Sequence, residues 1–189
     1  INTVQATLRG KVKKLGFKSP IIAQRLKRTP SIVRKLQRFP NMNLARMQDI
    51  GGIRIVLANV AEVYRLHTNI LNSKRPFEHE PLLPPKDYIK EPKSDGYRSL
   101  HQVFKYKSTT YPELDGLQIE LQIRTKLQHA WATAVETLGI IEKSSFKTGE
   151  GSEEFKRFFM LASALFSYNE RQPILPALAD IPIKEIAKE

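Results

Sequence analysis

Three stretches of the chain are dense in acidic, basic and amide side chains where strands would end and short loops would begin. They run from Arg25 to Lys35, from Gln48 to Arg54, and from Lys86 to His101 with a continuation over 120–125. Transfer of a phosphoryl-type group requires such side chains, because it depends on positioning, a divalent metal and cations around the phosphates rather than on covalent help. The three stretches therefore indicate transfer chemistry on a phosphate-rich substrate.

Two carboxylates are candidates for a metal site. Asp49 comes just before Ile53–Leu57, a β-branched run typical of a buried strand. Glu120 shares one face of another strand with Gln122 and Arg124, because side chains alternate along a strand. Taken alone, Asp49 fits a turn or cap and Glu120 fits an exposed strand face. Together, on neighbouring strands, they suit Mg²⁺, which prefers oxygen ligands and keeps several waters.

Basic residues are concentrated at the N-terminal end of the chain. The net charge is +12, and residues 1–48 contain twelve Lys and Arg and no acid, whereas the remainder is neutral with 19 bases and 19 acids. A field of one sign attracts phosphate-rich partners, although a solvated basic surface is the simpler alternative. Within this segment Arg25, Lys27 and Lys35, together with Arg54 further on, are suited to holding phosphates or stacking on a base.

Hydrophobic periodicity and cap residues predict an α/β or α+β fold in one domain over residues 1–189. Thr29 is expected to cap a helix with Pro30 at its first position, Asn59 and Ser152 to cap two more, and Thr125 to cap a fourth. A proline-rich loop is expected over 76–92, and a C-terminal tail or an edge contact over 172–189. The expected strands cover 20–27, 53–57, 100–107 and 117–124, and the helices 30–38, 59–73, 125–142 and 152–171.

The segments KDYIKEPKSDGYRSLH and IELQIRT resemble the synthetase domain of the RelA/SpoT family, particularly its small single-domain members. The resemblance extends from Arg25 to Glu136. It implies a mixed β-sheet flanked by helices, related to nucleotidyltransferases. It also implies a pyrophosphokinase that transfers the β,γ-pyrophosphoryl group of ATP to the 3′-hydroxyl of GDP or GTP, making ppGpp or pppGpp with Mg²⁺. The absence of cysteine is consistent with the expectation of a cytoplasmic protein.

The same resemblance implies a role for each candidate residue on the ATP side. Arg25 and Arg54 would sandwich the adenine. Asp49 and Glu120 would bind Mg²⁺, and Glu120 would also take the proton of the attacking 3′-hydroxyl. The side chains expected along the ATP phosphates are Lys27, Ser31, Lys35 and Arg38.

On the acceptor side, the resemblance implies that Tyr97 stacks on the guanine base. His101 and Gln122 would orient the transferring phosphates, while Lys93 and Arg124 would contact the acceptor phosphates. Two positions differ from the family pattern near this side. Thr137 follows Glu136 where the family usually has histidine, and His129 stands where an amide is frequent. Use of ATP is therefore a firmer expectation than the identity of the acceptor.

Other functions remain open at this point. A small relative can be a toxin that modifies the 3′ end of tRNA or adenosine nucleotides, and a non-catalytic RNA-binding module is a further alternative. RNA contact is expected through five basic residues upstream of the motifs. The apolar C-terminal helix is expected either to pack within the chain or to contact a partner, which would be a second copy or an antitoxin. No apolar run reaches bilayer length, and the absence of cysteine excludes disulfides and thiolate sites. The five basic residues are Arg9, Lys11, Lys13, Lys14 and Lys18.

Overall fold

The computed structural model describes residues 1–44, 47–73, 77, 79–108, 110–141 and 152–188, and it contains two compact units. The first comprises Ile1–Lys86 and His101–Ile123, and the second comprises Asp87–Leu100 and Arg124–Glu189. Each unit combines segments that are far apart in sequence, so the division does not separate two successive domains. The prediction of one synthetase domain over 1–189 stays a prediction. No helix in the described part of the chain is long and apolar enough to cross a bilayer.

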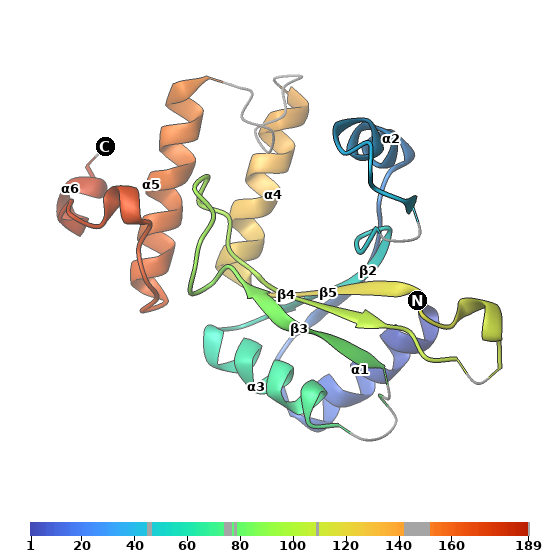
Figure 1. Ribbon diagram of the computed structural model, residues 1–189. Helices are drawn as coiled ribbons and strands as arrows, with labels where there is room; N and C mark the ends of the chain where they lie inside the picture. Colours follow the sequence, from blue (N-terminus) through green and yellow to red (C-terminus); the bar gives the residue numbers. More distant parts are fainter. Residues whose placement is uncertain (45–46, 74–76, 78, 109, 142–151, 189) are drawn as a thin grey trace. The chain divides into compact units, whose positions relative to one another are not determined.

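A five-stranded sheet has the strand order β1-β2-β5-β4-β3 (Figure 1). The four strands predicted from hydrophobic pattern are confirmed with shifts of one or two residues at their ends. In β1 and β2, which pair antiparallel, Arg25 lies opposite Gly52. The bounds are β1 Ile21–Leu26, β2 Gly51–Leu57, β3 Glu80–Asp87, β4 Leu100–Lys105 and β5 Gln118–Thr125.

Strand β3 corrects the prediction of a proline-rich loop over 76–92, in which residues 76 and 78 lie outside the described residues. Pro81, Pro84 and Pro85 all lie in this strand. Proline cannot donate a hydrogen bond to a neighbouring strand, which is why it is confined to sheet edges. Because β3 is at one edge of the sheet, its prolines are compatible with pairing on the other side.

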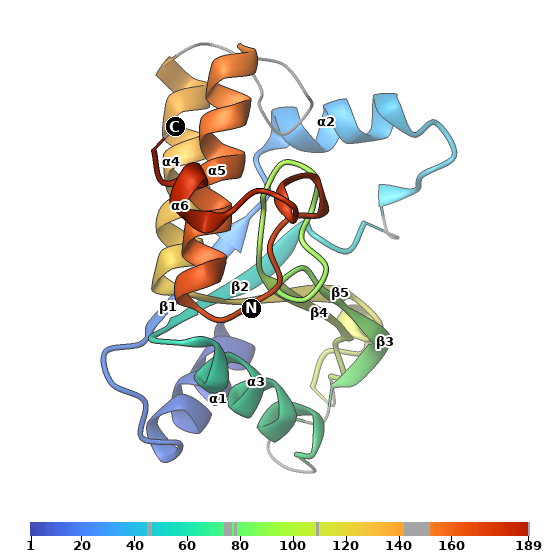
Figure 2. The ribbon, with the colours of Figure 1, turned by 90° about the vertical axis from the view of Figure 1, so that its left-hand side faces the viewer.

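Helices α1 (Asn2–Lys14) and α3 (Val60–Leu71) lie side by side below the sheet in Figures 1 and 2, and α3 contacts β2. Asn59 caps α3 as predicted, since its side chain accepts a hydrogen bond from the N–H of Glu62. Helix α1 was not predicted, although its buried residues have helical spacing. The apolar side chains that form this core are Val4, Leu8 and Val12 of α1 and Val63, Leu66 and Ile70 of α3.

The basic residues of the N-terminal segment do not form one uniform surface. Lys11 is buried with 8% of its surface exposed, and its Nζ donates a hydrogen bond to Ser73 Oγ. Burial of this ammonium lowers the pKa of Lys11, and the charge of Lys14 lowers it further. This burial does not favour the predicted contact of Lys11 with RNA. RNA contact through the exposed residues Arg9, Lys13, Lys14 and Lys18 stays a prediction.

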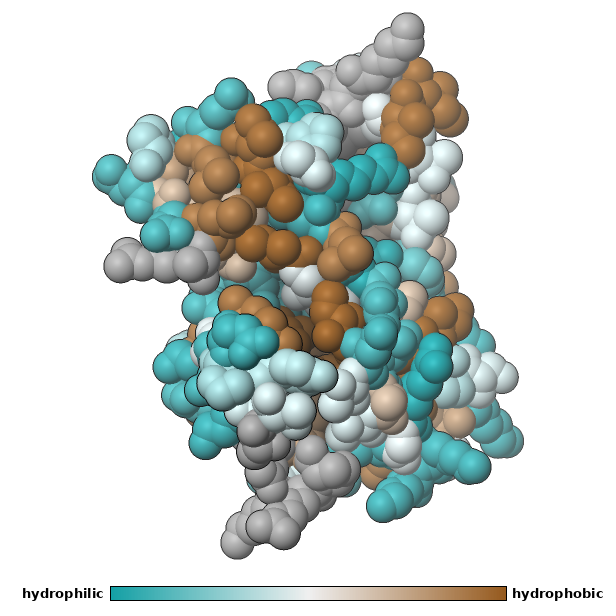
Figure 3. Space-filling view, turned by 90° about the vertical axis from the view of Figure 1, so that its right-hand side faces the viewer, coloured by the Kyte–Doolittle hydropathy of each residue, from teal (hydrophilic) through white to brown (hydrophobic). Residues whose placement is uncertain are grey.

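Helix α2 (Thr29–Arg38) has no buried residue, and it stands away from the sheet in Figure 2. The prediction of Thr29 as N-cap is wrong by one residue, because Arg28 has the extended cap conformation and Thr29 begins the helix. Apolar side chains gather over α2 and the segment after it, at the upper left of Figure 3, where Val33, Phe39 and Leu44 are about half exposed. Few apolar contacts therefore anchor α2, the helix that carries Lys35 and Arg38.

The second unit contains helices α4 (Lys126–Ile141) and α5 (Glu153–Asn169), which pack against each other. Thr125 and Ser152 cap them as predicted, by accepting hydrogen bonds from the N–H groups of Gln128 and Phe155. The prediction of a C-terminal tail over 172–189 is wrong. A 3₁₀ turn (Pro176–Leu178) and α6 (Ile183–Ile186) pack against α5 in an apolar cluster of Leu161, Ala164, Leu175, Leu178 and Ile186.

Candidate active site

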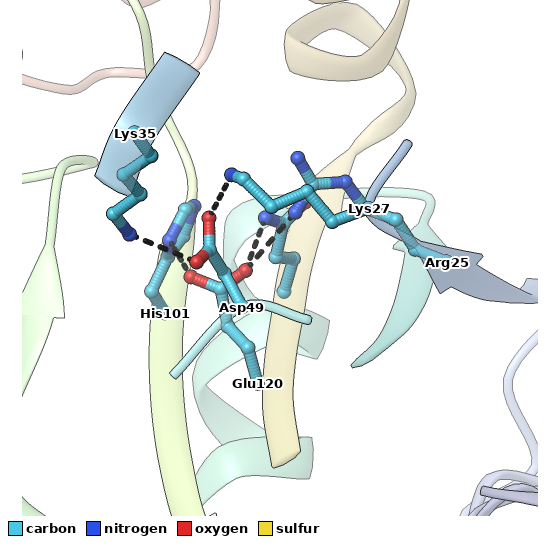
Figure 4. A network of polar contacts seen from close by, with 7 residues as sticks. Arg25, Lys27, Lys35, Asp49, His101 and Glu120 are labelled. Carbon is cyan, nitrogen blue, oxygen red and sulfur yellow. Dashed lines mark hydrogen bonds and ion pairs between the residues drawn. The ribbon is translucent and has the colours of Figure 1, made fainter. Parts of the chain in front are cut away.

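The first unit brings Asp49 together with two lysines at one end of the sheet (Figure 4). Lys27 follows β1, and its N–H donates to the carbonyl of Ile50, which places it beside Asp49. Its Nζ lies 2.5 Å from Asp49 Oδ2, while Lys35 Nζ reaches from α2 to within 2.9 Å of Asp49 Oδ1. Each carboxylate oxygen therefore has its own ammonium partner.

Glu120 of β5 is surrounded by three donors from three different parts of the unit. His101 Nδ1 on β4 lies 2.9 Å from Glu120 Oε1, and because a carboxylate only accepts, this nitrogen carries the proton. On the other oxygen, Gln122 Nε2 donates at 2.7 Å and Arg25 of β1 at 3.3 Å. The side chain of Glu120 is 13% exposed, so these donors replace most of its water.

Gly52 explains how β2 approaches β5 so closely beside these carboxylates. A Cβ at this position would lie 2.5 Å from the backbone oxygen of Glu120, a distance that side chains do not tolerate. Only glycine fits, because it has no Cβ. The pair Gly51-Gly52 at the start of β2 is a signal of a close backbone approach, but the sequence alone does not show which segment approaches it.

Both carboxylates are ionised at neutral pH, because their surroundings favour the charged form. Burial would raise the pKa of Asp49, but hydrogen bonds and charge from Lys27 and Lys35 outweigh it and hold that pKa below its ordinary value. Burial would likewise raise the pKa of Glu120. Hydrogen bonding and charge from His101, the Gln122 hydrogen bond and the charge of Arg25 together lower it instead.

The donor set fits Mg²⁺ held partly by substrate. Asp49 and Glu120 lie next to each other with their carboxylates directed into the same space in Figure 4. In the described ranges there is no group of three or more His, Cys, Asp or Glu side chains arranged to hold a metal. Mg²⁺ commonly uses one or two carboxylates together with substrate phosphates and waters, so two ionised carboxylates suffice.

The other residues predicted on the ATP side lie near this cluster in sequence but have different contacts. Arg54 projects from β2 opposite Ala23 and is half-buried. Ser31 and Arg38 are on α2, where the guanidinium of Arg38 lies 5.6 Å from the centre of the Phe39 ring. Their predicted contacts with adenine and phosphates stay predictions.

The predicted acceptor residues belong to the second unit, where Lys93 and Tyr97 lie together. Lys93 Nζ is 5.1 Å from the centre of the Tyr97 ring and 4.8 Å from that of Tyr88. Tyr88 was not predicted to contribute, although it lies in the same motif. Arg124 is only 1% exposed, so its predicted contact with acceptor phosphates stays a prediction that its burial does not favour.

Known proteins are similar to this chain in sequence and in fold. A model of the family described as "Region found in RelA / SpoT proteins" matches residues 24–150. GTP pyrophosphokinase YjbM of Bacillus subtilis (strain 168) is 32% identical over 149 residues, which cover 74% of this chain and 69% of YjbM. GTP pyrophosphokinase YwaC of the same organism is 32% identical over 114 residues, which cover 58% of this chain and 52% of YwaC, so the match spans about half of that relative.

Among solved structures, small alarmone synthetase 1 from Bacillus subtilis bound to its product pppGpp superimposes with a TM-score of 0.78. The match has 24% sequence identity and covers 90% of this chain and 87% of that one. It confirms the predicted fold class, a mixed sheet flanked by helices.

Proposed function

This chain belongs to the RelA/SpoT family, and we propose that it is an ATP-dependent pyrophosphokinase acting on the 3′-hydroxyl of GDP or GTP. In this reaction the 3′-oxygen forms a bond to the β-phosphorus of ATP. The bond between that phosphorus and the oxygen bridging to the α-phosphate breaks, and AMP leaves. The proton of the hydroxyl passes to a base on the protein.

The observation that carries the proposal is the pairing of two ionised carboxylates with cations suited to a triphosphate. Lys27 and Lys35 form ion pairs with Asp49, and Arg25 forms one with Glu120. With ATP and its metal bound, Lys27 and Lys35 would contact phosphate oxygens, while Asp49 and Glu120 would hold the metal. Each charged group would then keep a partner of opposite sign with or without substrate, so none would be left buried and unpaired.

Asp49 and Glu120 would hold Mg²⁺, which when bound supplies positive charge to the phosphate oxygens that become more negative during transfer. Lys27 and Lys35 add to that charge from the protein. Because such transfers depend mainly on position and charge, a preformed cluster of this kind suits the reaction.

Glu120 is the proposed base for the 3′-hydroxyl. It must be deprotonated before the reaction, and its lowered pKa ensures this at neutral pH. Its hydrogen bonds with His101 Nδ1 and Gln122 Nε2 fix the carboxylate in one orientation. Through these bonds the two side chains would hold the carboxylate of Glu120 while it takes the proton of the hydroxyl.

The acceptor base is proposed to stack on Tyr97, with Lys93 next to it. The Lys93 ammonium lies against this ring. Cations and nucleobases both favour the face of an aromatic ring, so an incoming guanine would displace Lys93 toward the acceptor phosphates. The GTP pyrophosphokinase names of YjbM and YwaC support a guanosine acceptor.

Acceptor profiling tests this proposal against its alternatives. The purified chain is incubated with Mg²⁺, labelled ATP and GDP, GTP, ADP or deacylated tRNA in turn, and the products are separated by chromatography. We expect labelled guanosine products from GDP or GTP. Transfer to ADP or tRNA alone would identify the adenosine-modifying or tRNA-modifying alternative, while transfer to none would support a non-catalytic RNA-binding module.

A further inference from the structure

The segment that carries Tyr97 is a closed turn within the second unit. The N–H of Gly96 donates to the carbonyl of Lys93 at 2.9 Å, and the N–H of Lys93 donates to the carbonyl of Tyr97 at 3.3 Å. Asp95 Oδ1 accepts from the N–H of Tyr97 at 2.8 Å. Gly96 has a φ of +94°, a conformation that favours glycine. The backbone at Tyr97 is thus well defined locally, but these bonds do not fix the turn to the rest of the unit.

Ser163 of α5 connects the turn to the rest of the unit. Its hydroxyl donates to the carbonyl of Gly96 at 2.7 Å and accepts from Arg98 Nε at 3.2 Å. The serine is 2% exposed, so water cannot replace either bond. One hydroxyl therefore contacts the residue before Tyr97 and the residue after it.

The surroundings of this hydroxyl leave the turn little room to move. A Cβ on Gly96 would lie 2.9 Å from Ser163 Cβ and 3.1 Å from Trp131, so the turn packs directly against α5 and α4. The rings of Tyr97 and Trp131 meet edge to face with centroids 6.3 Å apart. The direction of the Tyr97 ring therefore depends on how the turn is seated against Ser163 and Trp131.

Arg98 extends the connection to two further segments of the same unit. Its guanidinium donates to the carbonyl of Ile89 at 3.0 Å and to that of Pro173 at 2.7 Å. Burial lowers the pKa of Arg98 to about 10, against the opposing charge of Glu170, so the side chain still carries its proton at neutral pH. Every N–H group of the Arg98 guanidinium therefore remains a hydrogen-bond donor.

From this geometry we propose that Ser163 is a positioning residue for the acceptor nucleotide. It acts indirectly, by holding in place the turn that carries Tyr97. The inference rests on the proposed function, in which Tyr97 stacks on the acceptor base. Without the hydroxyl, the carbonyl of Gly96 loses its donor, and Arg98 loses an acceptor on the other side of Tyr97. The ring then samples more orientations, and acceptor binding weakens while ATP binding does not change.

The test compares Ser163→Ala with Ser167→Ala, a matched control. Ser167 is 0% exposed on the same helix, and its hydroxyl donates to the carbonyl of Ser163 at 2.7 Å rather than to the turn. Both changes remove one buried hydroxyl, so a purely structural effect would appear in both. Ser163→Cys, which keeps the shape with a weaker donor, replaces Ser163→Ala if thermal unfolding shows that the alanine variant does not fold.

We expect Ser163→Ala to raise the KM for GDP about three- to tenfold, the range for one lost hydrogen bond, with the KM for ATP unchanged. Ser167→Ala is expected to leave both unchanged. Hydrogen exchange of the Gly96 and Tyr97 amides, measured without nucleotide, should accelerate only in the Ser163 variant. An unchanged GDP KM in folded Ser163→Ala, or an equal rise in Ser167→Ala, would overturn the inference.

The two readouts also separate this inference from the proposed function. A wild-type protein that is inert with GDP and GTP contradicts the proposed function. The amide exchange of the turn then decides alone whether Ser163 positions Tyr97, because this measurement needs no acceptor. Equal exchange in the wild type and in Ser163→Ala would overturn the positioning role irrespective of activity.

Discussion

Replacing Asp49 by Asn, or Glu120 by Gln, is expected to reduce pyrophosphoryl transfer by about 1,000-fold or more while the fold is retained. Each change keeps the shape of the side chain and removes one negative charge from the proposed Mg²⁺ site. Charge stabilisation by a bound metal contributes several kcal/mol to lowering a reaction barrier, and each 1.36 kcal/mol changes the rate tenfold. Turnover is measured with Mg²⁺ as the only divalent metal, and thermal unfolding verifies the fold.

Glu80→Gln is the matched control for this experiment. Glu80 lies on the edge strand β3, where its exposed carboxylate pairs with Lys105 at 3.3 Å. The variant makes the same chemical change in the same unit, outside the cluster of Asp49 and Glu120. Its turnover should equal that of the wild type. Near-normal turnover of Asp49→Asn or Glu120→Gln would remove that residue from the proposed metal site.

Tyr97→Ala is expected to weaken acceptor use about 5- to 150-fold and to leave ATP binding unchanged. The range follows from the stacking of a base on an aromatic ring, which contributes about 1–3 kcal/mol. The Tyr97 ring is half-buried, and in the proposed function the base takes the place of Lys93 on its face. The KM for GDP or GTP and the calorimetric affinity for a non-hydrolysable ATP analogue are the two quantities to compare.

Tyr97→Phe provides the control, because it keeps the ring and removes only the hydroxyl. It should show a much smaller change in acceptor KM than the alanine variant. If ATP affinity in Tyr97→Ala falls as far as acceptor use does, Tyr97 contributes to the ATP side of the site or to folding instead.

Local signals in the sequence predicted much of the fold, because each has a local physical cause. The β-branched run of β2 and the caps Asn59 and Ser152 depend on neighbours a few residues away. Strand β3 was missed because its prolines are tolerated only at an edge, and sheet order could not be predicted from sequence. The sequence predicts a tail at the C-terminus because it does not show that Leu175 and Ile186 pack against apolar residues of α5.

The site shows the same division between local and long-range information. Asp49 and Glu120 were assigned from motifs, but their partners come from distant positions, such as Arg25, which lies 95 residues before Glu120. The burial of Lys11 depends on Ser73, 62 residues later. Ser163 lies in no motif and reaches Gly96 across 67 residues. Such contacts depend on the tertiary structure, which spacing along the chain does not reveal.

The chemistry of transfer is tested most directly by comparing two acceptors, 2′-deoxyGDP and 3′-deoxyGDP, in separate reactions. In each reaction, both the labelled acceptor product and the nucleotide released from ATP are followed. ATP labelled at its γ-phosphate is supplied with Mg²⁺, and AMP, ADP and labelled guanosine nucleotide are quantified together. The account predicts one AMP for each labelled product with 2′-deoxyGDP, and no product with 3′-deoxyGDP, which lacks the attacking oxygen. Release of ADP instead of AMP, or labelling of 3′-deoxyGDP, would contradict pyrophosphoryl transfer to the 3′-hydroxyl.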